Sequence, residues 1–144
     1  MLTTNQKGAA AETAIIHEAI KLGIGVYASI ADERADLIFD LGSRLLRVQC
    51  KTASRRGDVL VVTLYSSRRT AGGLRRTTYS EDEIDAFAAY CPETGVSYFF
   101  EWRDMTCRTE MRLRLTPARN NQAKGVKWAQ DFEFAAKLTT LLGP

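Results

Sequence analysis

Two segments of alternating polarity, separated by a glycine and a serine, constrain this sequence more than any other feature. The stretch ADLIFDLGSRLLRVQCKTA has the period of two that is typical of β-strands on both sides of Gly42 and Ser43. A two-residue loop with glycine first suits a type II′ turn, which joins antiparallel strands as a hairpin. With that turn, Asp36 faces Gln49, and directly opposed side chains lie on the same face of a sheet.

Polar side chains gather on one face of this hairpin. Arg47, Gln49 and Lys51 alternate with apolar residues along the second strand, and the register brings Asp36 to the same face. A solvent-exposed face with an Asp-Lys ion pair is one interpretation, and such pairs contribute about 0 to 1 kcal/mol. A functional site is the second, because an acid, an amide oxygen and a compact cation suit a hard divalent ion such as Mg²⁺ beside a phosphate.

Length and composition predict one domain, residues 1–144, because 144 residues with 45% hydrophobic content are enough for one core and too few for two ordinary domains. No stretch approaches the roughly 18 consecutive apolar residues of a membrane span, and the first residues lack the pattern of a secretion signal. These features favour a cytoplasmic protein without a membrane partner. Cys50, Cys91 and Cys107, with a single histidine, favour reduced thiols over a zinc site or disulfides.

Positive charge is concentrated between residues 44 and 76. This segment has nine Lys and Arg residues against one acid, Asp58, whereas the rest of the chain has eleven positive and sixteen acidic residues. The segregation favours a polyanionic partner, because paired arginines bind phosphates through parallel hydrogen bonds. A solvated basic loop is the simpler alternative. The candidate DNA-binding residues of this segment are Arg55, Arg56, Arg68, Arg69, Arg75 and Arg76.

The order of the elements predicts an α/β (α+β) chain with a central mixed sheet flanked by helices. A first helix is expected to begin at a cap on Thr4 or Asn5 and to end near residue 22. Residues 66–78 are predicted to form an arginine-rich loop, and Ser80 with Glu83 predicts a capping box for a helix over residues 81–90. Further strands are expected at residues 23–29, 58–66, 96–102 and 110–115, and an amphipathic helix at residues 126–142 with Trp128, Phe132, Ala135 and Leu138 or Leu142 along one side.

Glu12 is the anomaly of the first predicted helix. Its helical offsets from Ile16 and Ile20 place the carboxylate on the apolar face of that helix. A carboxylate that faces a core has to be paired, protonated or coordinated, because an isolated buried charge is costly. Taken alone, the pattern is explained as well by a glutamate at the edge of the apolar stripe that reaches toward solvent.

These residues together resemble a known nuclease family. Glu12, then Asp36 in ADLIFD, then Gln49-Cys50-Lys51 are similar to the PD-(D/E)XK nucleases, whose core has a helical Glu, a strand Asp and a (D/E)-x-K strand. The spacing resembles that of archaeal Holliday junction resolvases. The similarity to the small PD-(D/E)XK endonucleases associated with group I introns is more extensive. It continues through TTYSEDEIDAFAAYCPETGVSYFF, LRL and ARNNQAKGVKWAQDF and covers most of residues 7–134.

The resemblance implies a restriction-endonuclease-like core and a DNA endonuclease that uses Mg²⁺ or Mn²⁺. By position, it makes Glu12, Asp36, Gln49 and Lys51 the catalytic residues. Asp36, Gln49 and the backbone carbonyl of Cys50 would ligate the metal, and Glu12 would bind it directly or through water. Lys51 would orient the attacking water or stabilise the pentavalent phosphorane.

Gln49 departs from the family pattern, which has Asp or Glu at this position. Its amide oxygen can coordinate a metal but brings no negative charge, and a unit charge near 4 Å is worth about 4 kcal/mol at an effective dielectric of 20. Some homing members use glutamine here. Three functions therefore stay open: homing-type, site-specific cleavage of double-stranded DNA, a Holliday junction resolvase-like activity, and a catalytically silent DNA-binding module.

Double-stranded DNA is the expected partner in each case. Long DNA targets need more surface than one such domain offers, so we expect a homodimer or a homotetramer in the cytoplasm, associated with the nucleoid when bound to DNA. A polar loop is a further candidate DNA contact, although a polar turn that leads into the last helix explains it equally well. Its residues are Asn120, Asn121, Gln122 and Lys124.

Overall fold

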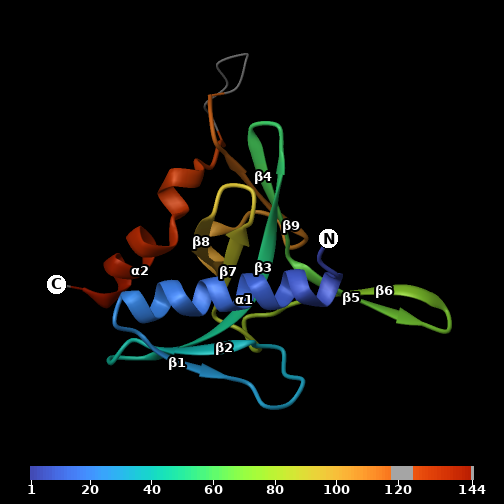
Figure 1. The fold of residues 1–144 in the computed structure, drawn as a ribbon, viewed down its shortest axis with the longest axis horizontal. Helices are drawn as coiled ribbons and strands as arrows, with labels where there is room; N and C mark the ends of the chain where they lie inside the picture. The colour runs from blue at the N-terminus through green and yellow to red at the C-terminus, as the bar shows by residue number, and fades with distance from the viewer. Residues whose placement is uncertain (118–124, 144) are drawn as a thin grey trace.

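A computed structural model describes residues 1–117 and 125–143 of the chain. Among these residues, a seven-stranded mixed sheet has the order β1-β2-β3-β4-β9, and β7 pairs with β3 in parallel and with β8 in antiparallel fashion (Figure 1). The strands are β1 (Gly25–Ala28), β2 (Leu37–Asp40), β3 (Leu45–Arg56), β4 (Val59–Thr63), β5 (Tyr65–Thr70), β6 (Gly73–Thr78), β7 (Ala86–Cys91), β8 (Val96–Glu101) and β9 (Glu110–Arg114). The helices are α1 (Thr4–Lys21), α2 (Phe134–Leu142) and the short 3-10 turns η1 (Trp102–Asp104) and η2 (Ala129–Phe132). This is the α+β class that the sequence predicts.

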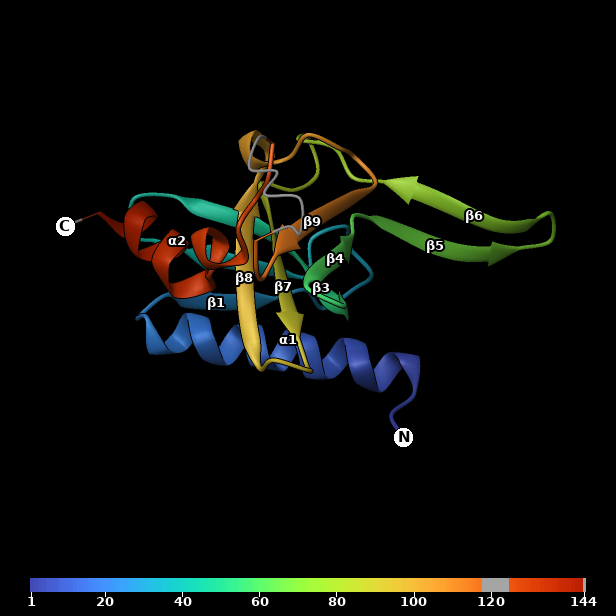
Figure 2. The ribbon, with the colours of Figure 1, turned by 90° about the horizontal axis from the view of Figure 1, so that it is seen from above.

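The first helix, α1, is capped one residue earlier than predicted. Thr3 is the cap, because its hydroxyl accepts a hydrogen bond from the Gln6 N–H at 3.2 Å and the Gln6 side chain accepts one from the Thr3 N–H at 2.9 Å. Ala11, Ile15 and Ala19 are buried at intervals of one helical turn, so this face packs on the sheet. Figure 2 shows α1 lying along one side of the sheet.

The β2–β3 hairpin has the predicted register. Leu37 pairs with Val48 and Asp40 with Leu45, the Leu41 N–H donates to the Arg44 carbonyl at 2.9 Å, and Gly42 has a φ of 87° in the turn. The ladder ends one pair before Asp36 and Gln49. The hairpin therefore opens at the position where the sequence places its polar cluster.

The predicted helix over residues 81–90 is wrong, because residues 86–91 form the central strand β7. The predicted contacts between Ser80 and Glu83 do form, with the Ser80 N–H donating to Glu83 Oε1 at 3.1 Å, but they close a single turn before the strand. β7 is buried on both faces between β3 and β8, so its sequence AFAAYC lacks the alternation of a half-exposed strand. A short, continuously apolar segment fits a helix and a buried strand equally well.

The prediction of a loop over residues 66–78 is also wrong. Residues 65–78 form the antiparallel β5–β6 hairpin, in which Tyr65 pairs with Thr78 and Arg68 with Arg75. Most of its residues are polar and exposed, with Tyr65 and Leu74 as the exceptions in character, and such a segment shows no apolar period. Both views show the hairpin extending away from the rest of the chain (Figures 1 and 2).

The last predicted helix is shorter than expected. In place of one helix over residues 126–142, η2 is followed by α2, and the backbone at Glu133 leaves the helical region between them. The break rotates the buried side. Phe134 and Leu138 are buried, whereas Ala135 and Leu142 of the predicted stripe are exposed.

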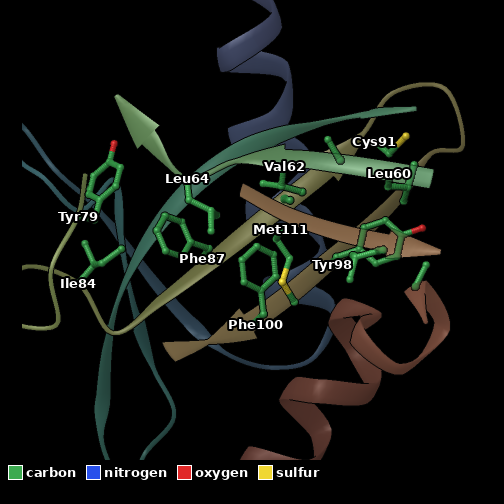
Figure 3. Packing of buried hydrophobic residues seen from close by; sticks show 14 residues of the cluster. Leu60, Val62, Leu64, Tyr79, Ile84, Phe87, Cys91, Tyr98, Phe100 and Met111 are labelled. Atoms are coloured by element: carbon green, nitrogen blue, oxygen red, sulfur yellow. The ribbon is translucent and has the colours of Figure 1, made fainter. Parts of the chain in front are cut away.

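Two hydrophobic clusters lie on opposite faces of β3, β7 and β8. One is covered by α1 and α2 and includes Phe39 and Phe99. The other, shown in Figure 3, is closed by β4 and β9 and includes Phe87, Phe100 and Met111. A core on each face holds β3 rigidly, which is what a site built on this strand requires. Within the described residues, no helix has the length and apolar character to cross a membrane.

Candidate active site

A pocket of about 300 Å³ lies where the β2–β3 hairpin opens. Asp36 and Gln49 both line it, together with Arg34, Ser66 and Tyr79 from the neighbouring segments. A larger hollow of about 440 Å³ shares Arg34 and Asp36 but is lined by neither Gln49 nor Lys51. The smaller pocket is therefore the one that joins Asp36 and Gln49, and neither pocket is lined by Lys51 or Glu12.

Asp36 is held at the first residue before β2. Its backbone N–H donates to the Val48 carbonyl at 2.9 Å, and its carboxylate Oδ2 accepts a hydrogen bond from the Cys50 N–H at 3.0 Å. Burial raises the pKa of Asp36 above its ordinary value, although the Cys50 N–H and the Lys51 ammonium both pull it down. One carboxylate oxygen is thus fixed by the neighbouring strand.

Gln49 has a buried side-chain oxygen without a hydrogen-bond donor. Among the described residues, nothing donates to Oε1, while Nε2 makes only a long 3.5 Å contact with the Cys50 carbonyl. A buried amide oxygen left in this state costs about 1 to 3 kcal/mol, and such atoms often mark a functional site. Its acceptor capacity is available for a ligand.

Lys51 is half-buried in the middle of β3. Its ammonium donates a hydrogen bond of 2.9 Å to the Tyr65 carbonyl, and it lies 5.1 Å from the centre of the Tyr79 ring. Burial lowers the pKa of Lys51, and the charge of Asp36 acts in the opposite direction. The ammonium and the Asp36 carboxylate therefore belong to one electrostatic cluster.

Glu12 approaches this cluster from α1, the helix that covers the sheet. Its side chain is half-buried, and burial together with the negative charge of Asp36 raises the pKa of Glu12. The same two carboxylates act on a nearby thiol, since burial, then Asp36, then Glu12 raise the pKa of Cys50. The structure thus brings the four predicted catalytic residues, Glu12, Asp36, Gln49 and Lys51, into one region.

The predicted DNA-binding arginines lie on two neighbouring hairpins. Arg55 and Arg56 are exposed near the tip of β3–β4, where the Arg55 guanidinium donates to the Gly57 carbonyl at 2.9 Å. Arg68, Arg69, Arg75 and Arg76 are exposed along β5–β6. The other candidate contacts, Asn120, Asn121, Gln122 and Lys124, lie outside the described residues.

Arg47, the third polar residue on the same face of β3, belongs to a different structure. Its side chain donates to both carboxylate oxygens of Asp85 at 3.1 Å, and to the backbone carbonyls of Glu81 and Asp82. The Asp85 N–H in turn donates to the Arg47 carbonyl at 2.8 Å. Arg47 therefore anchors the segment that leads into β7.

Sequence reasoning missed Arg34 and Tyr79, which both line the pocket. The Arg34 guanidinium lies over the Tyr79 ring, with its central carbon 3.8 Å from the ring centre. The one sequence signal for Arg34 is its position two residues before Asp36, which places two opposite charges on one side of an extended segment. Tyr79 lies between an exposed hairpin and a buried strand, where no periodic pattern operates.

This arrangement has the pattern of the PD-(D/E)XK class: an acid where two strands separate, a lysine in the middle of the second strand, and a glutamate on the first helix. Residues 2–135 match the family model described as PD-(D/E)XK endonuclease, and the chain belongs to that family.

A solved structure agrees with this classification. The chain is similar to the structure of a bacterial homing endonuclease, I-Ssp6803I, with 27% sequence identity and a TM-score of 0.79 over 99% of this chain and 96% of that one. The expected restriction-endonuclease-like core is thereby confirmed. No curated protein matches the sequence.

Proposed function

We propose that this chain is a metal-dependent endonuclease that hydrolyses phosphodiester bonds in double-stranded DNA at a specific, homing-type site. The observation that carries the proposal is the buried Gln49 oxygen, which no described residue supplies with a donor, in the same pocket as Asp36 and two residues before Lys51 on β3. A carboxylate, a free amide oxygen and an ammonium are groups that suit phosphodiester hydrolysis at a metal ion.

The residues present fit a hard divalent cation, Mg²⁺ or Mn²⁺. Within residues 1–117 and 125–143, no three His, Cys, Asp or Glu side chains group together as a metal site, so the amide of Gln49 has to complete the set. Asp36, Gln49 and the Cys50 carbonyl would hold the ion, with Glu12 beside them. Such an ion acts as a Lewis acid on the phosphoryl oxygen and lowers the pKa of water.

The role of Lys51 follows from its position. Its ammonium is partly desolvated and fixed by the Tyr65 carbonyl, so it faces the cluster as a pre-organised positive charge. It would orient the attacking water or offset the negative charge that develops on the phosphoryl oxygens. Burial makes this charge more effective than one in bulk water.

The exposed β5–β6 hairpin suits a DNA partner. A two-stranded β-ribbon fits the major groove of B-DNA, and arginine is the side chain that most often reads guanine there. The ladder pairs Arg68 with Arg75 on one face and places Arg69 and Arg76 on the other. Arg55 and Arg56 would add phosphate contacts from the neighbouring hairpin.

Several finer points belong to the same proposal. The chain would act as one domain, residues 1–144, and as a homodimer or homotetramer, because a long target exceeds the surface of one copy. It would be cytoplasmic and associated with the nucleoid when bound. The similarity to a bacterial homing endonuclease supports the homing-type activity over the alternatives.

A catalytically silent DNA-binding module is the second candidate. The observation that favours it is Gln49 itself, since an amide in place of a carboxylate weakens the attraction for a cation. In this case the hairpin arginines would bind DNA and no bond would be broken.

Nicking of supercoiled plasmid in Mg²⁺ or Mn²⁺ separates these functions. The endonuclease function is supported if the wild type converts the plasmid to nicked or linear DNA and Asp36→Ala does not. Tight binding without cleavage of any substrate supports the silent module. A four-way junction cut in preference to linear duplex of the same arms would identify a resolvase-like activity.

A further inference from the structure

The Arg34 side chain binds both strands of the β5–β6 hairpin at the base of the hairpin. Its Nη1 donates to the Ser66 hydroxyl at 3.1 Å on β5, and its Nη2 donates to the Thr78 carbonyl at 2.8 Å on β6. Its Nε donates to Glu83 Oε2 at 2.9 Å. Three contacts in three directions hold the planar guanidinium in one orientation, which a lysine could not reproduce.

The same hairpin base is the hydrogen-bond partner of Lys51. The Lys51 ammonium donates to the carbonyl of Tyr65, which pairs with Thr78 across the ladder. The Tyr79 ring lies against both cations, 3.8 Å from the Arg34 guanidinium carbon and 5.1 Å from the Lys51 nitrogen. Tyr79 is 5% exposed, so both cations contact a buried residue of the core cluster.

We propose that Arg34 is a positioning residue that acts through the β5–β6 hairpin: it fixes the hairpin base so that the Tyr65 carbonyl holds the Lys51 ammonium in its working position. The inference rests on the proposed nuclease function for its kinetic consequence. It also makes a purely structural prediction, that Arg34 holds residues 65–78 in place.

The contacts of Arg34 distinguish this role from a direct phosphate contact. A guanidinium that binds phosphate bidentately presents two unoccupied parallel donors, whereas three of the five Arg34 N–H donors, on Nε, Nη1 and Nη2, are bonded to the protein. By contrast, the Arg68 side chain on the hairpin is 81% exposed, and its ion pair within the described residues is with Asp32, 91% exposed, at 3.4 Å. Arg68 is placed to contact DNA, and Arg34 is placed to hold the element that does so.

The test combines single-turnover cleavage of supercoiled plasmid, binding of a labelled linear fragment in Ca²⁺, and hydrogen exchange of the free protein. Arg34→Gln should slow cleavage in the bound state about 10- to 100-fold, because small displacements of a catalytic group have effects of this size. Binding should weaken much less than cleavage, because the loosened hairpin keeps its arginines, and Arg103→Gln, an exposed arginine on η1, is the control. Amides of residues 65–78 should exchange faster than in the wild type.

Three outcomes would overturn the inference. Wild-type cleavage by Arg34→Gln would show that Lys51 does not depend on the hairpin base, and a loss confined to binding would make Arg34 a DNA contact. Restored cleavage in Arg34→Lys would show that charge alone matters. Should Arg34→Gln fail to fold, Glu83→Gln removes one anchor of Arg34 and should show the same pattern more weakly.

The inference and the proposed function fail in different ways. If the wild type cuts no DNA, the nuclease proposal is wrong. Hydrogen exchange alone then tests whether Arg34 holds residues 65–78 in place. Faster exchange at residues 65–78 in Arg34→Gln then supports it, and unchanged exchange overturns it.

Discussion

The Lys51 ammonium lies 2.9 Å from the Tyr65 carbonyl oxygen, so a side chain from the middle of β3 reaches the first residue of the exposed hairpin. The candidate catalytic cation and the candidate DNA-binding element thus share one hydrogen bond. Because β3 has a hydrophobic cluster on each face, the strand end of this bond is rigid, and the hairpin end has few packing contacts of its own. DNA bound along the hairpin would therefore act directly on the position of Lys51.

Lys51→Met tests the role of this charge. Methionine keeps most of the length of the side chain and removes the ammonium, so cleavage should fall at least about 100-fold, the scale of losing a pre-organised electrostatic contact. DNA affinity should change little, because Lys51 does not lie on the exposed face of the hairpin. Single-turnover cleavage and filter binding measure the two effects. Lys21→Met, an exposed lysine paired with Glu18 on α1, is the control, and equal rates in both variants would remove Lys51 from the active site.

Gln49→Glu should strengthen metal binding. The new carboxylate would add a charge next to Asp36, and a unit charge near 4 Å is worth about 4 kcal/mol before full solvent screening, so half-maximal Mg²⁺ should fall at least about tenfold. Without metal, three carboxylates repel one another, and the Tm should drop below that of the wild type. Added Mg²⁺ should raise this Tm again, since it binds only the folded state.

Thermal unfolding with and without Mg²⁺ measures these changes for Gln49→Glu. Gln130→Glu, an exposed glutamine on η2, controls for the added charge. A variant with unchanged metal-free Tm and unchanged Mg²⁺ dependence would show that the Gln49 side chain does not face the cation.

Much of the site could be predicted from the sequence because it lies on one hairpin. The alternation around Gly42 and Ser43 fixes the register over residues 37–48, and the structure has the same pairs. Glu12 was expected on the apolar face with Ile16 and Ile20, but Ile20 is exposed and the buried positions are Ala11, Ile15 and Ala19, so Glu12 lies at the edge of the buried face. Both arguments are local, and local patterns survive in the fold when one face of an element is buried and the other is not.

The errors occurred where that asymmetry is absent. β7 is buried on both faces and β5–β6 is largely exposed on both, so the first has no charged residues to mark its period and the second has too few apolar ones, Tyr65 and Leu74. Arg34 was missed because its hydrogen bonds are with residues 32 to 49 positions away, and Tyr79 because its cation contacts are with the distant Arg34 and Lys51. Such contacts depend on tertiary structure, which sequence spacing does not encode.

Asp85→Asn should destabilise the protein in a pH-dependent way. Burial alone would raise the pKa of Asp85. Arg47 acts in the opposite direction through side-chain and backbone hydrogen bonds and through its positive charge, and it holds the pKa of Asp85 below its ordinary value. The ionised form therefore stabilises the fold above the unfolded-state pKa of about 3.9, and this contribution disappears as the pH falls through the lower folded-state value. The loss at pH 7 should be about 1 to 3 kcal/mol, as for hydrogen bonds to charged groups.

Urea unfolding at several pH values checks this expectation for Asp85. The difference in unfolding free energy between wild type and Asp85→Asn should be constant from about pH 5 to 7 and narrow below about pH 4. Asp131→Asn, an exposed aspartate on η2, should show a smaller difference. A gap that widens as the pH falls would contradict the assignment of the Arg47–Asp85 pair.

The two faces of the β5–β6 hairpin predict two different double variants. Arg68 and Arg75 are directly opposed on one face, and Arg69 and Arg76 lie on the other, where the Arg76 guanidinium carbon is 4.7 Å from the centre of the Tyr65 ring. A ribbon in the major groove turns one face toward the bases and leaves the other near the backbone.

Each lost phosphate contact reduces the slope of log K against log salt by about 0.9. The double variant of the backbone-facing pair should therefore reduce this slope by about 1.8. Loss of the base-facing pair should mainly reduce discrimination between target and non-target DNA. Binding titrations over a range of salt concentrations show which face meets the backbone. The two double variants to compare are Arg68→Gln/Arg75→Gln and Arg69→Gln/Arg76→Gln. Equal slopes in both variants and in the control Arg103→Gln/Arg108→Gln would place the hairpin outside the DNA interface.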